Sequence, residues 1–272
     1  MDQLARAPAP RWLRVAIRLR LTRLVHFVRR DTRYVPACER PSDDDGLRML
    51  ALAHLARRHG FELARLPPGR AVVIEDVAFN GILAVANRAL ARLARDFDLE
   101  LPPDLRRAGA ATDAALEELW DDAAGQYYSR NVTTGALIRI PTVATFVPLW
   151  AEDSSRSHAD ALFARLTSPA NWPPFPVPSV PTDARQYEAE RYWKGPTWVN
   201  MNWVIIQGLR GSSNHSLADE LAERTLGLIR DRGFFEYFSA IRGTGFGAEE
   251  FSWTAALALE LLDSAQVAPR QA

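Results

Sequence analysis

Apolar residues recur every three or four positions along most of this 272-residue chain, and loops rich in proline, glycine and aromatic residues interrupt them. That spacing gathers the apolar side chains on one face of an α-helix. It predicts helices at residues 11–30, 46–59, 77–96, 112–124, 157–166, 198–209, 216–232 and 252–262. Helices that alternate with long loops favour a toroid of helical hairpins, but the period alone also fits a solenoid or a bundle.

Some of these helices carry signals for where they begin and which face they bury. Ser42 or Asp43 can cap the helix at 46–59, Gly60 can end it, and Thr197 can cap the helix at 198–209. The faces predicted to be buried consist of Leu47, Leu50, Leu52, Leu55 and Ala56 in helix 46–59 and of Ile82, Leu83, Ala86, Leu90 and Leu93 in helix 77–96. Each face needs a packing partner elsewhere in the fold.

Two segments do not follow the helical pattern. In residues 125–140, β-branched and aromatic residues surround Thr133, Thr134 and Gly135, which predicts a short hairpin. Six prolines between residues 168 and 181 predict an extended loop, whereas the run after Pro141 is compatible with a further helix. No linker divides the chain, so we expect a single domain covering residues 1–272.

The first 35 residues are expected to form a basic, helical segment. Leu13, Ile17, Leu21, Leu24 and Val28 share one face of the helix predicted at 11–30, and arginines dominate the other faces. Such a helix could bind a membrane surface or serve as a targeting peptide, or it could pack its apolar stripe on the protein. The sequence leaves these interpretations open.

The charge balance and the cysteine content bear on the class of function. Lysine plus arginine number 33 and aspartate plus glutamate number 33, so no excess of positive charge favours nucleic acid as a partner. Cys38 is the single cysteine and can form no internal disulfide, which fits the reducing cytoplasm. No apolar run is long enough for a membrane span, and the five scattered histidines predict neither a metal site nor a cofactor.

Residues 191–203, "RYWKGPTWVNMNW", contain three tryptophans, a tyrosine and two asparagines. The apolar face of a pyranose stacks on an aromatic ring, and amide side chains bind its hydroxyls. This composition favours a sugar site lined by Tyr192, Trp193, Trp198 and Asn202. The alternative is that the rings fill the core at the start of a helix.

Two other segments are candidates for the same site. "GFFEYF" (residues 233–238) places Glu236 among aromatic residues, where desolvation suits a carboxyl group to acid–base chemistry. The glycine-rich run that follows is not part of a βαβ unit, so we interpret it as a flexible loop that brings Glu250 toward a pocket. Tyr127 and Tyr128, with Arg130, could line the mouth of the pocket or could be ordinary hairpin residues.

Taken together and in order, these runs resemble the mannosylglycerate and glucosylglycerate hydrolases, inverting glycosidases related to family 63. The matching runs are "RRDTRYV" (29–35), "RPSDDD" (40–45), "IEDVAFN" (74–80), "GQYYSR" (125–130), "IPTVATFVPLWA" (140–151), "PVPSVP" (176–181), "RYWKGPTWVNMNWVIIQGLR" (191–210), "GFFEYF" (233–238) and "FSWTAALALELL" (251–262). They span residues 10–262, and their combination is specific.

The resemblance implies an (α/α)6 barrel that hydrolyses a small carbohydrate substrate such as a hexosylglycerate. The glutamate of the "FxEYF"-type motif is the general base in this family, and Glu236 matches it. Tyr192, Trp193 and Trp198 match pocket aromatics. The arginine that opens the "RP" motif is implicated in holding the glycerate carboxylate, and Arg40 matches it. The sequence does not distinguish a glucosyl from a mannosyl substrate.

The chain also departs from the family pattern. The general acid of the family is an aspartate in a motif like "DNSPRWD", whereas residues 7–13 read "APAPRWL", with Ala7 or a neighbour at the aspartate position. Relatives carry further N-terminal helices, so we expect a partial barrel whose exposed faces favour self-association or a partner that supplies those helices. Hydrolysis is expected to be impaired, and a non-catalytic sugar-binding remnant or a helical interaction protein remain the alternatives.

Overall fold

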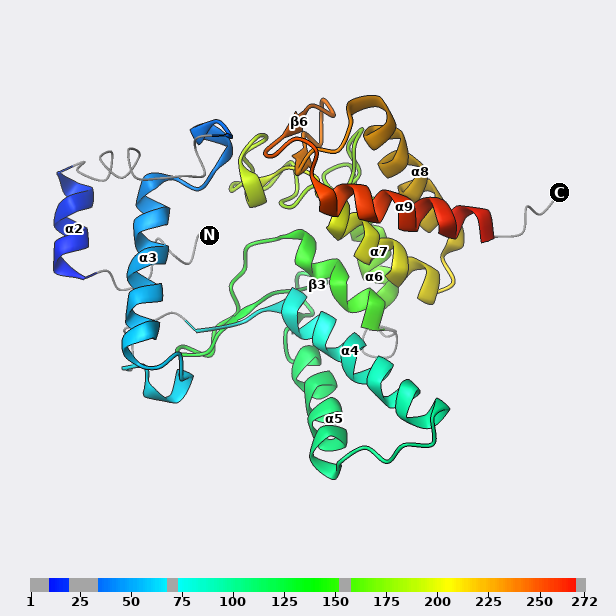
Figure 1. The fold of residues 1–272 in the computed structure, drawn as a ribbon, viewed down its shortest axis with the longest axis horizontal. Coiled ribbons are helices and arrows are strands. Elements are labelled where there is room, and N and C mark those ends of the chain that lie inside the picture. Colours follow the sequence, from blue (N-terminus) through cyan, green and yellow to red (C-terminus); the bar gives the residue numbers. More distant parts are fainter. Residues whose placement is uncertain (1–9, 20–33, 68–72, 152–157, 268–272) are drawn as a thin grey trace.

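The computed structural model describes residues 10–19, 34–67, 73–151 and 158–267, and helices dominate them (Figure 1). The α-helices are α2 (Arg11–Arg18), α3 (Asp43–Arg58), α4 (Val77–Asp96), α5 (Pro103–Glu117), α6 (Ala159–Leu166), α7 (Val199–Gly211), α8 (His215–Arg232) and α9 (Ser252–Val267). Short 3-10 segments join them: η3 (Ala37–Glu39), η4 (Leu63–Arg65), η5 (Val143–Ala151) and η7 (Tyr192–Lys194). The helices predicted at 46–59, 77–96, 157–166, 198–209, 216–232 and 252–262 are confirmed, with ends that differ by a few residues.

Short antiparallel strand pairs accompany the helices. They are β1 (Ile74–Glu75) with β4 (Arg130–Asn131), β2 (Trp120–Asp121) with β3 (Gln126–Tyr127), and β5 (Tyr237–Phe238) with β6 (Gly245–Phe246). The predicted turn at residues 133–135 is confirmed, because Asn131 N donates to Ala136 O at 3.0 Å and Gly135 N donates to Asn131 O at 2.8 Å. The fold is therefore mostly helical, with these short strand pairs between its helices.

The centre of the core is η5, against which both α4 and α7 pack. Its residues are almost all buried, including Phe146, Val147 and Leu149. Glycines allow the close approach of both helices. A Cβ on Gly81 of α4 would lie 2.9 Å from Val147 Cγ1, and a Cβ on Gly208 of α7 would lie 2.8 Å from Leu149 Cβ. This packing fixes α7, whose first residues carry the aromatic cluster described below.

Two predicted helices are wrong in extent or type. The helix expected at 112–124 is α5, which begins at Pro103 and ends at Glu117. Proline suits the first helical position because its fixed φ is helical and its missing N–H is not needed there. Asp121 Oδ1 then accepts hydrogen bonds from the backbone of Ala123 and Ala124, which forms the β2–β3 turn. The run after Pro141 forms the 3-10 segment η5, with Pro148 inside it, rather than an α-helix.

The predicted caps are only partly confirmed. Ser42 caps α3, since its Oγ accepts from Asp45 N at 3.2 Å. Gly60 follows the helix with φ +68°, and the next residue, Phe61, donates to Ala56 O at 2.8 Å, as in a Schellman motif. Thr197 does not cap α7, because its hydroxyl donates instead to Phe175 O at 2.6 Å.

The buried faces predicted for α3 and α4 are wrong. No residue of α3 is buried, and Leu50 is largely exposed. In α4 the small residues Gly81 and Ala84 are buried, while Leu83 is 47% exposed and Ile82, Leu90 and Leu93 are also exposed. The reason is that α4 approaches η5 through its small residues, so the larger apolar side chains point elsewhere. These side chains are only about half covered by the described part of the chain.

The N-terminal helices lie beside the larger body (Figure 1). Of the helix predicted at 11–30, α2 accounts for residues 11–18, and Leu13 is buried as expected. The rest of that prediction, including Leu21, Leu24 and Val28, falls outside the described residues. Among the helices that the structure describes, none is long and apolar enough to cross a membrane.

Candidate active site

Aromatic rings are stacked where α7 begins. Trp193 lies face to face on Trp198, with ring centroids 3.9 Å apart and an angle of 3° between the planes. Trp198 in turn stacks on Tyr237 at 4.9 Å, and Tyr192 meets Trp198 edge-on at 5.2 Å. Trp198 Nε1 donates to Tyr192 O at 3.2 Å, which ties the segment before α7 to the stack. The structure thus brings Tyr192, Trp193 and Trp198 together, with Trp198 buried; that they line a sugar site stays a prediction.

Asn202 does not belong to this surface. Its side chain is fully buried and clamps the peptide group between Pro176 and Val177. Its Oδ1 accepts from Val177 N at 3.0 Å, while its Nδ2 donates to Pro176 O at 2.8 Å and to Thr225 Oγ1 at 2.9 Å. The prediction that Asn202 binds a ligand is therefore wrong in this structure, because the core uses its hydrogen-bonding groups.

Glu236 stands just before β5, where the strand pairing holds its backbone. Phe238 and Thr197 exchange backbone hydrogen bonds of 2.9 and 2.8 Å, which fastens β5 to the residue before Trp198. Glu236 N donates to Ala248 O at 3.0 Å, and Ala248 N donates back to Glu236 Oε2 at 3.1 Å. Residue Glu236 is 7% exposed, so its carboxylate is almost wholly enclosed.

Arg40 makes a bidentate contact with Glu236. Its Nη1 donates to Oε1 at 3.1 Å and its Nη2 donates to Oε2 at 2.8 Å, and its guanidinium lies 5.5 Å from the centre of the Tyr192 ring. Burial lowers the pKa of Arg40, but the hydrogen bonds to Glu236 and the charge of Glu236 outweigh this effect, so the pKa is raised above its usual value. A parallel pair of charge-assisted hydrogen bonds is among the stronger polar contacts in proteins.

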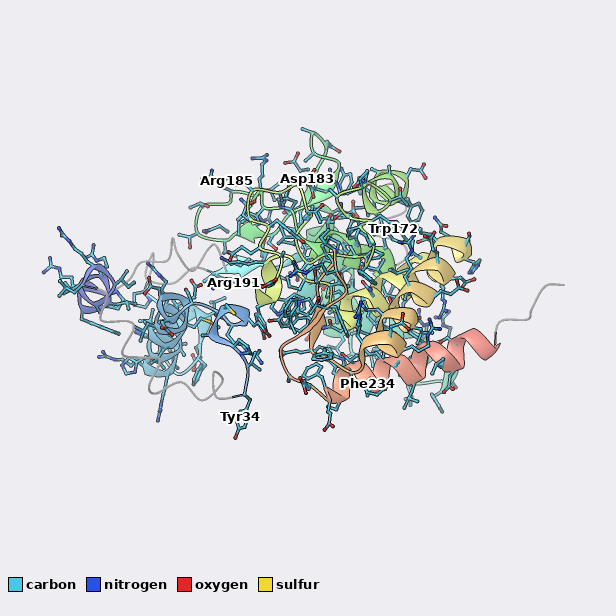
Figure 2. The ribbon with its side chains drawn as sticks, turned by 90° about the horizontal axis from the view of Figure 1, so that it is seen from above. Tyr34, Trp172, Asp183, Arg185, Arg191 and Phe234 are labelled. Atoms are coloured by element: carbon cyan, nitrogen blue, oxygen red, sulfur yellow. The ribbon has the colours of Figure 1, made fainter. Side chains whose placement is uncertain are left out.

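The short segment of residues 37–40, which we call the strap, docks onto the loops around Glu236. Tyr237 Oη donates to Glu39 O at 2.6 Å, and Glu39 Oε2 accepts from Gly247 N at 2.7 Å. Arg191 Nη1 donates to Arg40 O at 3.4 Å, and Figure 2 shows Arg191 where the N-terminal helices approach the larger body. Burial, with a contribution from the Glu39 carboxylate, raises the pKa of the Tyr237 phenol well above its usual value.

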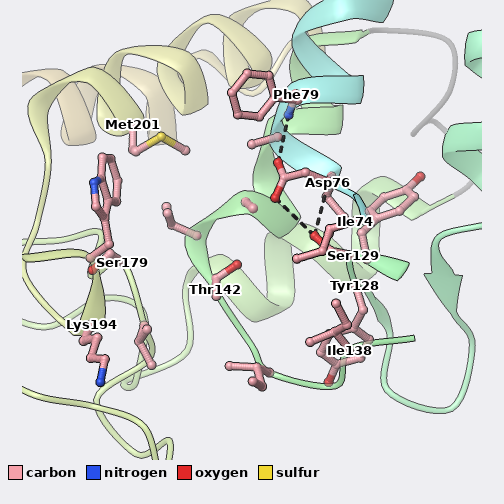
Figure 3. Close-up of a pocket in the computed structure, with 18 of the residues that line it drawn as sticks. Ile74, Asp76, Phe79, Tyr128, Ser129, Ile138, Thr142, Ser179, Lys194 and Met201 are labelled. Atoms are coloured by element: carbon pink, nitrogen blue, oxygen red, sulfur yellow. Dashed lines mark hydrogen bonds between the residues drawn. The ribbon is translucent and has the colours of Figure 1, made fainter. Parts of the chain in front are cut away.

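A cavity of about 530 Å³ opens beside the aromatic stack. Tyr127, Tyr128 and Trp193 line it, together with Ile74, Asp76, Phe79, Ile82, Ser129, Thr142, Ser179, Gln186, Lys194, Met201 and Trp253. Figure 3 shows Asp76, Ser129 and Tyr128 on one side and Ser179, Lys194 and Met201 on the other. Trp253 also lines the small recess that contains Glu236 and Trp198, so the cavity and the carboxylate are neighbours.

Two further candidates do not reach this cavity. Glu250 is exposed, with φ +51°, and lines neither the cavity nor the recess of Glu236. Arg130 pairs with Glu75 across β1 and β4 and with Glu118 at 2.9 Å, so it is committed to the strand pair. The Ala248 contacts hold the loop itself against Glu236, but the Glu250 side chain stays exposed, so the expectation that Glu250 reaches the pocket is not met in this structure.

The model of the mannosylglycerate hydrolase MGH1-like glycoside hydrolase domain matches residues 5–254, which include the strap, the aromatic stack and Glu236. The chain belongs to this family. It is 35% identical to the mannosylglycerate hydrolase of Rubrobacter radiotolerans over 87% of its own length and 54% of that protein. It is 26% identical to the glucosylglycerate hydrolase of Mycolicibacterium hassiacum over 93% of its length and 59% of that protein.

Solved structures of the family support the same assignment. The GH63 mannosylglycerate hydrolase of Thermus thermophilus, solved with Tris and D-glycerate, matches with a TM-score of 0.80 and 35% identity. The match covers 85% of this chain and 56% of that chain, and the same enzyme has been solved with glucose. This member of the family thus spans about half the length of the relatives that it matches.

Sequence reasoning missed several residues around the site. Glu39, Arg191 and Gly247 hold the strap and its neighbours together, and Asp76 and Gln186 line the cavity. Their contacts join segments that are far apart in the chain, and no local spacing reports such contacts. Glu39 alone could have been flagged, because it directly precedes the arginine of the "RP" motif.

Proposed function

We propose that this chain carries the base side of an inverting glycosidase site, with Glu236 as the general base for hydrolysis of a hexosylglycerate. The observation that carries the proposal is the arrangement of Arg40, Tyr192 and Trp198 around the enclosed Glu236 carboxylate. An inverting enzyme uses such a carboxylate to activate water on one face of the sugar. A guanidinium beside it suits an aglycone with a carboxylate of its own.

The 530 Å³ cavity is our candidate for the sugar site. Its volume falls in the range of small-molecule sites, roughly 300–1,000 Å³. Trp193, Tyr128 and Trp253 offer ring faces for a pyranose, and Gln186, Asp76 and Ser129 offer polar groups for its hydroxyls. The family resemblance implies an (α/α)6 barrel, and this chain spans about half the length of the relatives that it matches, so we infer a partial barrel.

We expect protonation of the leaving group to be impaired in this chain. Residues 7–13 contain no aspartate or glutamate, although this stretch resembles the acid motif of the family. Loss of protonation of the leaving oxygen costs roughly 10²- to 10⁴-fold in rate. We therefore expect slow release of hexose from glucosylglycerate or mannosylglycerate by this chain.

The direct test is the release of free hexose from each of these compounds by purified, folded protein, with Glu236→Gln as the control. Slow release that disappears in Glu236→Gln supports the proposal. Release that is unchanged in Glu236→Gln contradicts it, because water would then be activated by another group. A comparison of initial rates on the two substrates reports the preferred hexose.

One observation favours a second candidate, a helical interaction protein. The apolar side chains Ile82, Leu83, Leu90 and Leu93 are exposed on α4. Contiguous apolar surface on a helix is a typical site of association. Self-association, or a partner that supplies further helices, would cover it. Sedimentation of wild type and of Leu90→Glu would separate this function from catalysis, because Leu90 lines neither the cavity nor the recess of Glu236.

A further inference from the structure

We propose that Arg40 is a latch on Glu236 that a ligand carboxylate opens. In the structure the guanidinium donates to both oxygens of Glu236, and Ala248 N donates to Oε2 as well. A general base must offer a lone pair to water. With these donors in place, little of the Glu236 carboxylate remains free for that task, so the latched state is a resting state.

The strap is built to hold this latch. Its backbone is held at Glu39 O by Tyr237 Oη and at Arg40 O by Arg191 Nη1, and its Glu39 side chain is held at Oε2 by Gly247 N. These anchors belong to the same loops that position Glu236. Arg40 is therefore brought to the carboxylate from 196 residues away in the chain and kept there by several contacts.

Within the part of the chain that the structure describes, the latched state leaves one donor of the guanidinium unsatisfied. Its Nη1 and Nη2 serve Glu236, while its Nε is buried and has no hydrogen-bond partner among the described residues. A guanidinium has five N–H donors and binds carboxylates along two edges. Because this edge is closed to solvent, a carboxylate can pair with it only after Arg40 moves away from Glu236, and that movement releases the base.

This inference rests on the proposed function in one respect, namely that the ligand of the site carries a carboxylate. It adds that binding of that carboxylate works against the Arg40–Glu236 pair. Removing the negative charge of Glu236 should strengthen the binding of an anion, because Glu236 both competes for Arg40 and repels the ligand carboxylate. A residue that merely contributes to the shape or the hydrogen bonding of a pocket would have the opposite effect when replaced.

The test is calorimetric titration of D-glycerate into wild type, Glu236→Gln, Glu39→Gln and Arg40→Gln, with glycerol as a neutral probe. Glu236→Gln removes the competing charge-assisted hydrogen bonds, so we expect its Kd for D-glycerate to be roughly tenfold lower than that of wild type. Binding should be lost in Arg40→Gln, and the response to glycerol should be the same in wild type and Glu236→Gln. Circular dichroism establishes that each variant is folded, and Glu236→Ala, which also removes the charge, replaces Glu236→Gln if the latter does not fold.

The outcomes separate the latch from the proposed function. Equal or weaker binding of D-glycerate in the Glu236 variants overturns the latch, and so does the absence of binding in all of the proteins. Binding that is tighter in Glu236→Gln than in Glu39→Gln, which removes a neighbouring negative charge not paired with Arg40, supports the latch even if wild type releases no hexose; equal tightening in both variants is simple loss of repulsion and overturns it.

Discussion

Replacement of Gly247 by alanine tests whether the glycine-rich loop is fitted to Glu236. Gly247 has φ +76°, and a Cβ there would lie 2.6 Å from Glu236 Oε2 and 2.7 Å from Glu236 Cβ. The left-handed backbone costs alanine about 1–2 kcal/mol. Overpacking against the glutamate adds about 1–3 kcal/mol. Gly247→Ala should therefore lower the free energy of unfolding by about 2–5 kcal/mol.

Gly135→Ala is the matched control for this prediction. Gly135 has a similar φ of +68°, but a Cβ there would meet no atom within 4 Å. It should lose only the backbone part, about 1–2 kcal/mol. Urea denaturation of both variants gives the difference, which isolates the clash with Glu236. Equal losses of stability in the two variants would refute the reasoning, because they would show that the loop has no steric relation to the carboxylate.

Three further predictions follow from the fold and its polar groups. Asn202→Leu should lower the free energy of unfolding by about 3 kcal/mol or more in thermal denaturation, since Val177 N and Pro176 O would be left without partners; an effect below about 1 kcal/mol would contradict the clamp. Gly208→Ala should destabilise the protein, because its Cβ would meet Leu149 and Trp150. Gly227→Ala has room in α8 and should stabilise the protein by about 0.5–1 kcal/mol. The same sign of change in both variants would argue against close packing of α7 on η5. Because the pKa of Tyr237 is raised, the folded state keeps the phenol proton above pH 10, where an unfolded tyrosine ionises, and stability falls as the pH rises above 10. Tyr237→Phe should make this alkaline decline less steep. An unchanged slope in denaturation at pH 9–11 would show that Tyr237 does not contribute.

The sequence could predict those parts of the fold that depend on local pattern. The start of α3 at Ser42 and the end at Gly60 follow from side-chain and backbone preferences that act within a single turn. The packing faces could not be predicted. The apolar residues of α4 recur with a clear helical period, but α4 approaches η5 through Gly81 and Ala84. A pattern of hydrophobicity does not show which small residues allow such close packing.

The candidate site shows the same division. The ring types in residues 191–198 indicated the aromatic stack, and the "GFFEYF" motif indicated Glu236, because both are features of short segments. The same composition placed Asn202 at the ligand, but the structure shows it holding a backbone peptide in the core. The contact of Arg40 with Glu236 joins residues 196 positions apart, so it could be seen only in the folded chain.

The measurement that tests the central claim most directly is the hydrolysis of glucosyl and mannosyl fluorides, in both anomeric forms. Fluoride leaves without being protonated, so a site with a base and no acid should hydrolyse a hexosyl fluoride much faster than the corresponding hexosylglycerate. Our account predicts release of fluoride by wild type that is lost in Glu236→Gln. Equal rates in the two proteins, or no release by folded wild type, would show that Glu236 is not the general base of this chain.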